Sequence, residues 1–220
     1  MDWTALSLTL WLATLNALIL FALGAPLACW LARSRWSGKF LVEAVVALPL
    51  VMPPTVLGFY LLWSTGPHSP IGQTYAAVVG HALPFSFAGI LVGTLICNVP
   101  FAVRPFAAAF AGIDQRLVEA SWCLGVSRLE TWRRIVLPLA WPGLLAGIVL
   151  TFAHTIGEFG VVLMIGGNIP GVTRTLSIAI FDDVQALDYA AAGRTSLGLV
   201  AFSFCTLCLV YFLQRRTALA

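Results

Sequence analysis

Long apolar runs alternate with short polar connectors along the chain of 220 residues. A membrane-spanning helix needs about 20 predominantly apolar residues, and five runs meet this requirement. They predict spanning helices at about 6–32, 40–64, 75–101, 139–165 and 195–213. A sixth span would require the long first run to bend at Pro26. The pattern therefore predicts an all-α transmembrane protein, with one domain over 1–220 that forms a bundle of about five spanning helices.

The connector at about 102–138 differs from the others because it is long and charged. Its eight charged side chains would cost on the order of 20 kcal/mol in the middle of a bilayer, at about 3 kcal/mol each. We therefore expect this connector to lie outside the membrane. The charged residues are Arg104, Asp114, Arg116, Glu119, Arg128, Glu130, Arg133 and Arg134.

The charges elsewhere are few and are concentrated at the ends of the apolar runs. Only 10% of the residues are charged, whereas a soluble domain has about 25%. Ten of the twelve Lys and Arg residues follow the first, third or fifth run, ending with Arg215 and Arg216. Because such residues stay on the cytoplasmic side, the N-terminus is predicted outside and the C-terminus in the cytoplasm. The same clustering excludes a nucleic-acid-binding face, despite the net charge of +3.

Two predicted spans contain residues that break helices. Pro49, Pro53 and Pro54 lie in the second span, where each removes a backbone hydrogen bond. Freed backbone groups in a membrane must be satisfied by protein or water, so this span is predicted to face protein or a pathway, and its three prolines are candidate pathway residues. In the fourth span, two glycines predict a bend near a gate. This segment comprises Gly157, Glu158, Phe159 and Gly160.

Apolar residues recur at helical spacing in the charged connector. From Ile113 onward they predict a short helix, which Gly125 ends. Ser127 and Glu130 have the spacing of a capping box and predict the start of a second helix, which ends at Pro138. Taken alone, such amphipathic helices are also typical of segments that merely lie in the headgroup region.

The spacing of the residues in this connector resembles the EAA motif of ABC-importer permeases. That motif is Glu-Ala-Ala, three residues, Gly, nine residues and Ile-x-Leu-Pro, and only its third position differs here. The matching residues are Glu119, Ala120, Ser121, Gly125, Ile135, Leu137 and Pro138. The stretches "LPLVMPPTVLGFYLL" and "GEFGVVLMIGGNIPGVTRTLSIAIFD" are similar to molybdate permeases, and less closely to sulfate and thiosulfate permeases.

The resemblance implies a type I ABC importer permease, in which a homodimer of this chain encloses one pathway through the lipid membrane. Two cytoplasmic ATP-binding subunits would hydrolyse ATP, and an extracytoplasmic binding protein would deliver molybdate. The charged connector would be the coupling loop that docks on the ATPase subunits. Arg174 is a candidate for docking the binding protein. No catalytic residue, cofactor or metal is expected in the chain itself.

Glu158 is the most conspicuous charged residue of the apolar runs. Because its carboxylate would repel an oxyanion, we favour a structural role, with Arg174 or the local backbone as its partner. The isolated polar residues His81, His154 and Asn98 are predicted to make hydrogen bonds between helices.

Several other functions stay open on the sequence alone. A sulfate, thiosulfate or tungstate permease would carry the same motif. A secondary transporter driven by an ion gradient would show ionisable residues at the midplane and inverted repeats, and neither is clear. A membrane enzyme or redox subunit would need a nucleophile with a base, or paired histidines. Cys205 and Cys208 have the spacing of a metal motif, but they lie in an apolar run and are predicted to pack helices.

Overall fold

The computed structural model describes residues 2–218, and the side chains of residues 2–212. Arg215 and Arg216, which contribute to the predicted orientation, therefore lie outside the described side chains. The described residues form helices joined by turns. These are α1 (Trp3–Arg33), α2 (Lys39–Val51), α3 (Pro54–Thr65), α4 (Pro70–Val79), α5 (Phe87–Ala111), α6 (Gln115–Cys123), α7 (Arg128–Thr131), the π-helix η1 (Trp132–Val136), α8 (Leu137–Gly157), α9 (Gly160–Gly166), α10 (Leu176–Gln185) and α11 (Tyr189–Ala218).

Four helical runs in the described part of the chain are long and apolar enough to cross a membrane. α1, α5 and most of α11 are three of them, and α7, η1 and α8 join into the fourth, Arg128–Gly157. α2 and α3 form a fifth candidate that bends by 109°, as a broken span or a re-entrant loop. The predicted all-α bundle is thus confirmed with four to five spans. α1 continues through Pro26, so the first run is one span.

The third span differs from its prediction at both ends. α4 ends at Gly80, whose φ of +87° favours glycine, so the run from residue 75 is not one helix. α5 starts after Ser86, whose hydroxyl caps it, and continues to Ala111. The prediction ended this span at 101 because Arg104 is charged. Arg104 is nevertheless accommodated on α5 because it lies exposed, and a long arginine side chain can carry its charged end toward water.

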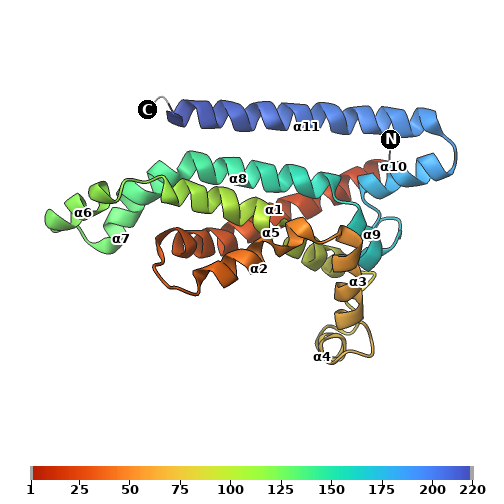
Figure 1. Ribbon diagram of the computed structural model, residues 1–220. Coiled ribbons are helices and arrows are strands. Elements are labelled where there is room, and N and C mark those ends of the chain that lie inside the picture. Colours follow the sequence, from red (N-terminus) through yellow and green to blue (C-terminus); the bar gives the residue numbers. More distant parts are fainter. Residues whose placement is uncertain (1, 219–220) are drawn as a thin grey trace.

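The helices are arranged so that the two ends of the bundle differ (Figure 1). α6 and α7 lie at one end, which α11 also approaches as it finishes. The N-terminus and α10 lie at the opposite end. α11 runs along α8 on one side of the bundle, whereas α2, α3 and α4 lie on the other side. The charged connector is therefore separated from the N-terminus by the length of the spans.

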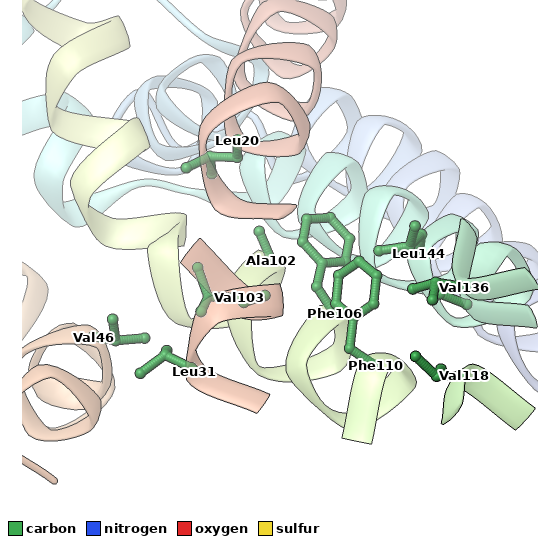
Figure 2. Close-up of a cluster of buried hydrophobic side chains, with 12 residues drawn as sticks. Leu20, Leu31, Val46, Ala102, Val103, Phe106, Phe110, Val118, Val136 and Leu144 are labelled. Carbon is green, nitrogen blue, oxygen red and sulfur yellow. The ribbon is translucent and has the colours of Figure 1, made fainter. Parts of the chain in front are cut away.

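A hydrophobic core joins α1, α5 and α8 and reaches the charged connector. Phe106 of α5 is fully buried, and its ring meets Phe21 edge-on at 6.1 Å between centroids. Figure 2 shows Val118 of α6 and Val136 of η1 in the same cluster. A second cluster joins α9 to α1, α3, α5 and α10. The short helices of the connector are therefore fixed to the membrane core instead of lying loose on its surface.

Glycines allow α8 to approach α5 closely. A Cβ atom added at Gly147 would lie 2.6 Å from the Phe106 ring, and one added at Gly143 would lie 2.5 Å from Ala109 Cβ. Both distances are shorter than van der Waals contact. The four-residue spacing of these glycines is typical of packed membrane helices.

Replacing Gly147 with leucine should therefore lower the melting temperature of the purified protein by about 5 °C or more, because overpacking a core costs about 1–3 kcal/mol. Gly198→Leu is the matched control, since an added Cβ there meets nothing within 4 Å. Differential scanning fluorimetry in detergent measures both. Equal melting temperatures for the two variants would contradict the close contact of α5 and α8.

Candidate functional site

The charged connector folds as a helix, a glycine turn and a second helix, as its sequence predicts. The carboxylate of Asp114 caps α6 by accepting a hydrogen bond from the backbone N–H of Arg116 at 2.9 Å. Gly125 follows α6 with φ of +79°, a conformation that favours glycine. Ser127 caps α7 through the N–H of Glu130 at 3.3 Å. The Glu130 carboxylate pairs with Arg134 at 2.9 Å rather than completing the capping box.

Two buried hydroxyl groups join the two short helices. Ser121 Oγ of α6 and Thr131 Oγ1 of α7 are hydrogen-bonded at 2.8 Å. The carbonyl of Ser121 also accepts a hydrogen bond from the N–H of Val126 at 3.1 Å. Ser121 is the position at which the motif usually has alanine, which has no side-chain oxygen for this bond. The partner Thr131 was not predicted, since only their distance in space connects the two residues.

The outer face of the connector is exposed and carries both apolar and charged side chains. Glu119 and Ala120 lie on it, and the side chains of Leu124 and Leu129 are 83% and 68% exposed. The guanidinium of Arg128 lies 5.5 Å from the centre of the Trp122 ring. Exposed apolar side chains beside charged ones are typical of protein interaction surfaces. The connector is thus anchored on one face and available on the other.

The rest of the motif lies where the connector enters the fourth span. Ile135 and Leu137 are half-buried, and Pro138 is exposed. The prediction that the second helix ends at Pro138 is wrong, because the helical run continues from Arg128 to Gly157. Proline lacks a backbone N–H group, and its absence normally ends a helix. Here η1 adopts the wider π-helical register, in which the Leu137 N–H reaches the Trp132 carbonyl, and the chain passes the proline without a break.

The two predicted helix breaks of the spans lie in contact with each other. α2 and α3 are separated at Met52–Pro53, and α8 and α9 are separated at Glu158–Phe159. A Cβ added at Gly160 would lie 2.8 Å from Pro54 Cβ. The structure thus brings together residues about 100 positions apart in the sequence. Pro49 differs, because it lies inside α2 and is not part of the break.

Glu158 is buried, with 6% of its surface exposed, and its partners are local. Its Oε1 accepts a hydrogen bond from the N–H of Val161 at 3.3 Å, at the start of α9. Its Oε2 accepts one from Cys97 Sγ at 3.5 Å and lies 3.9 Å from His154 Nδ1. The carboxylate thus bridges the broken span and α5. Its backbone partner was predicted, whereas Cys97 and His154 were not.

Asn98 is the centre of a hydrogen-bonded network between the spans. Its Oδ1 accepts a hydrogen bond from His154 Nδ1 at 2.8 Å, and its Nδ2 donates to Thr155 Oγ1 at 3.2 Å. Thr94 extends the network to α1, because its hydroxyl accepts a hydrogen bond from Asn16 Nδ2 at 2.8 Å. The predicted helix–helix role of Asn98 and His154 is therefore observed.

The network also includes a residue that was not predicted from the sequence, Asn16. It does not include His81, which was predicted to make hydrogen bonds between helices. Asn16 was missed, although a lone asparagine in an apolar run is the same signal that identified Asn98. His81 does not make the predicted hydrogen bond between helices among the described residues, because it is exposed, its Nδ1 contacts the carbonyl of the adjacent Ala82 at 3.0 Å, and its ring meets Tyr75 edge-on.

Replacing Glu158 with leucine should destabilise the protein by about 1–3 kcal/mol, because the buried N–H of Val161 would lose its acceptor. Glu158→Gln keeps an oxygen at that place and should stay close to wild type. Thermal unfolding in detergent distinguishes the two. If the glutamine variant is as unstable as the leucine variant, the negative charge of Glu158 matters and its hydrogen bond to α9 does not explain its role.

Arg174 lies just before α10 and close to Asp2 at the start of the chain. Its guanidinium binds Asp182 at 2.9 Å and lies 3.9 Å from Asp2. Arg174 and Asp2 line a pocket of about 420 Å³, which Asp183 and Arg194 also border. The predicted pairing of Arg174 with Glu158 is therefore wrong, because the nearer carboxylates of Asp182 and Asp2 occupy the arginine.

Comparison with known proteins identifies the family of the chain. Residues 24–219 match the family described as binding-protein-dependent transport system inner membrane component. The chain is 49% identical to the molybdenum transport system permease protein ModB of Azotobacter vinelandii, over 99% of this chain and 96% of that protein. It is 34% identical to ModB of Escherichia coli strain K12, over 97% and 94% of the two chains.

The fold also matches a solved transporter of the same class. The inward-facing MetNI methionine ABC transporter superimposes with a TM-score of 0.71 at 19% identity, over 97% of this chain and 94% of that one. The family match confirms the resemblance seen in the motif. The chain therefore belongs to the binding-protein-dependent transport family, as a multi-pass inner membrane permease subunit of an ABC transporter.

Proposed function

We propose that this permease carries molybdate into the cytoplasm with energy from ATP. The observation that carries the proposal is the 49% identity, over 99% of the chain, to a molybdenum transport system permease. In this family ATP is hydrolysed by a separate subunit. The permease contributes the pathway and the surface through which that subunit acts.

The connector between α5 and α8 is proposed as the coupling loop that docks on the ATPase subunits. Glu119 has no ion pair among the described residues, so its carboxylate is available to a basic group of a partner. Ala120 is small and exposed beside it, which allows close approach. The inner face is held by Val118 and Val136 in the core. A force applied at the outer face is thus passed to the spans.

Two copies of the chain are proposed to enclose the pathway, with the paired breaks at Pro53–Pro54 and Gly157–Gly160 near its gate. The exposed apolar face of α2 supports this arrangement, since such a face needs lipid or a second copy against it. Its exposed residues include Phe40, Leu41, Val45 and Leu48. Glu158 is proposed to support the gate without binding the substrate, because both of its carboxylate oxygens already have protein partners.

The proposed orientation places α6 and α7 in the cytoplasm and the N-terminus outside, following the distribution of Lys and Arg. Arg174 and its pocket would then face the extracytoplasmic binding protein. Asp2 and Asp182 neutralise part of the arginine's charge. The binding protein would therefore meet a mixed surface, on which charge pattern gives specificity more than affinity.

Uptake of labelled molybdate tests the proposed function in cells that lack this chain. Wild-type protein should restore uptake, and excess tungstate should block it while excess sulfate does not. Uptake should continue when the proton gradient is collapsed and ATP is maintained. Equal blocking by sulfate would replace molybdate with a broader oxyanion specificity. If uptake stops when the proton gradient is collapsed but continues when ATP is depleted, the ATP-driven mechanism is contradicted.

A further inference from the structure

A large apolar cavity opens between α1 and α8, beside the coupling loop. Its volume is about 650 Å³. α1 contributes Phe21, Ala25 and Cys29, and Leu144 of α8 faces them. Trp132 of η1 lies at the end nearest the loop. Both α1 and the run that contains α8 are candidate membrane spans, so a cavity between them is within reach of membrane lipid.

One end of the cavity is positively charged. Arg33 and Ser34, at the end of α1, border it, and no Asp or Glu is among the residues that line it. Arg33 is exposed and makes no ion pair within the part of the chain that the structure describes. Trp30 and Trp132 also border the cavity, and tryptophan is enriched where membrane meets water. An apolar hollow with an arginine at its rim fits a ligand that has a fatty chain and an anionic head.

The size of the cavity favours a lipid over a helix of a second copy. A helix about 10 Å in diameter occupies on the order of 400 Å³ per turn of 5.4 Å. The cavity would therefore hold fewer than two turns of a helix, whereas ligand sites for single small molecules are typically about 300–1,000 Å³. Because lipid tails are as apolar as the side chains of the cavity, an acyl chain can move into it from the bilayer, and the selectivity for one lipid comes from its head group. The phosphate of the same molecule reaches Arg33 as a charge-assisted hydrogen-bond partner.

We propose that this cavity binds one anionic phospholipid, with an acyl chain between α1 and α8 and the phosphate at Arg33. The bound chain contacts Trp132 and Leu137, which belong to or directly follow the π-helical segment η1. π-Helical turns are frequent at functional sites. The lipid thus fills the space behind the segment that joins the coupling loop to the fourth span. The inference depends on the membrane location of the chain and not on its substrate.

Native mass spectrometry of the full-length protein, released from nanodiscs of equal parts phosphatidylglycerol and phosphatidylcholine, tests this proposal. Wild type should retain phosphatidylglycerol at least fivefold over phosphatidylcholine. Arg33→Gln should remove this preference, whereas Arg35→Gln should keep it, because Arg35 is exposed nearby but does not border the cavity. Ala25→Trp should fill the cavity and reduce retention of both lipids.

Further measurements separate the proposal from its rivals. The melting temperature of each variant shows whether it is folded, and Arg33→Gln, as an exposed substitution, should melt with wild type. Glycerol phosphate, which has the head but no acyl chain, should not displace the retained lipid. Equal retention of both lipids by wild type, or no effect of Arg33→Gln, would overturn the proposal. So would a crosslink from Cys29 to a second copy that persists in excess phosphatidylglycerol, since a helix would then occupy the cavity.

Discussion

Gly125→Trp should reduce ATP-driven molybdate uptake at least tenfold and weaken binding of the ATPase subunits. No described atom lies within 4 Å of a Cβ added at this position, so the new side chain starts in open space. It extends into the space where the partner is proposed to dock. In addition, the φ of +79° disfavours side chains other than glycine by about 1–2 kcal/mol, which strains the turn between α6 and α7.

Gly80→Trp is the matched control for this prediction. Gly80 also has a positive φ, of +87°, and nothing lies within 4 Å of an added Cβ. It ends α4, far from the coupling loop (Figure 1). Co-purification of the ATPase subunits with each variant is the measurement, because the control should keep them and Gly125→Trp should lose them. Equal retention, together with full uptake by Gly125→Trp, would remove the coupling role from this loop.

Gly160→Leu should also reduce uptake by about tenfold or more, for a different reason. An added Cβ would lie 2.8 Å from Pro54 Cβ, and the proline ring has little freedom to move. The substitution therefore forces the two helix breaks apart. Overpacking of this kind costs about 1–3 kcal/mol, which corresponds to roughly 5- to 150-fold in an equilibrium.

Gly198→Leu is the control, because this glycine of α11 is not part of the proposed gate. A Cβ added there meets nothing within 4 Å, so uptake should stay within about twofold of wild type. Immunoblots of membranes show whether both variants accumulate equally. If the two leucine variants lower uptake to the same extent, the contact between Gly160 and Pro54 is not required for transport. If Gly160→Leu accumulates normally and still fails, the contact serves transport and not folding.

The spans and the two short helices of the charged connector could be predicted because their signals are local. Apolar runs of the right length gave the helices, and Gly125 and Ser127 gave the turn and cap of the loop. The helix breaks at Pro53–Pro54 and Gly157–Gly160 were also visible, since proline and glycine act on the backbone where they stand. What the residues alone did not indicate was that the two breaks touch, because that contact joins distant parts of the chain.

The errors have physical causes of the same kind. The third span was started too early because Gly80 lies in an apolar run, and composition does not show that its backbone is left-handed. The continuous helix past Pro138 depends on a π-helical register that no residue pattern signalled. Ser121 looked like a neutral replacement until the structure placed Thr131 against it. In each case the deciding partner lies elsewhere in the sequence, or the deciding quantity is a dihedral angle.

The unbroken run Arg128–Gly157 has a mechanical consequence. It contains 30 residues, so at 1.5 Å per residue it forms a rod about 45 Å long. One end is the second helix of the loop, and the other ends at Glu158, where the chain first departs from helical geometry. A tilt of about 5° about one end of such a rod displaces the other by about 4 Å, by simple trigonometry on that length. A small rotation at the loop is thereby amplified into a shift as large as an atom's diameter at the far end, where the run ends at Glu158 and Gly160 lies against Pro54.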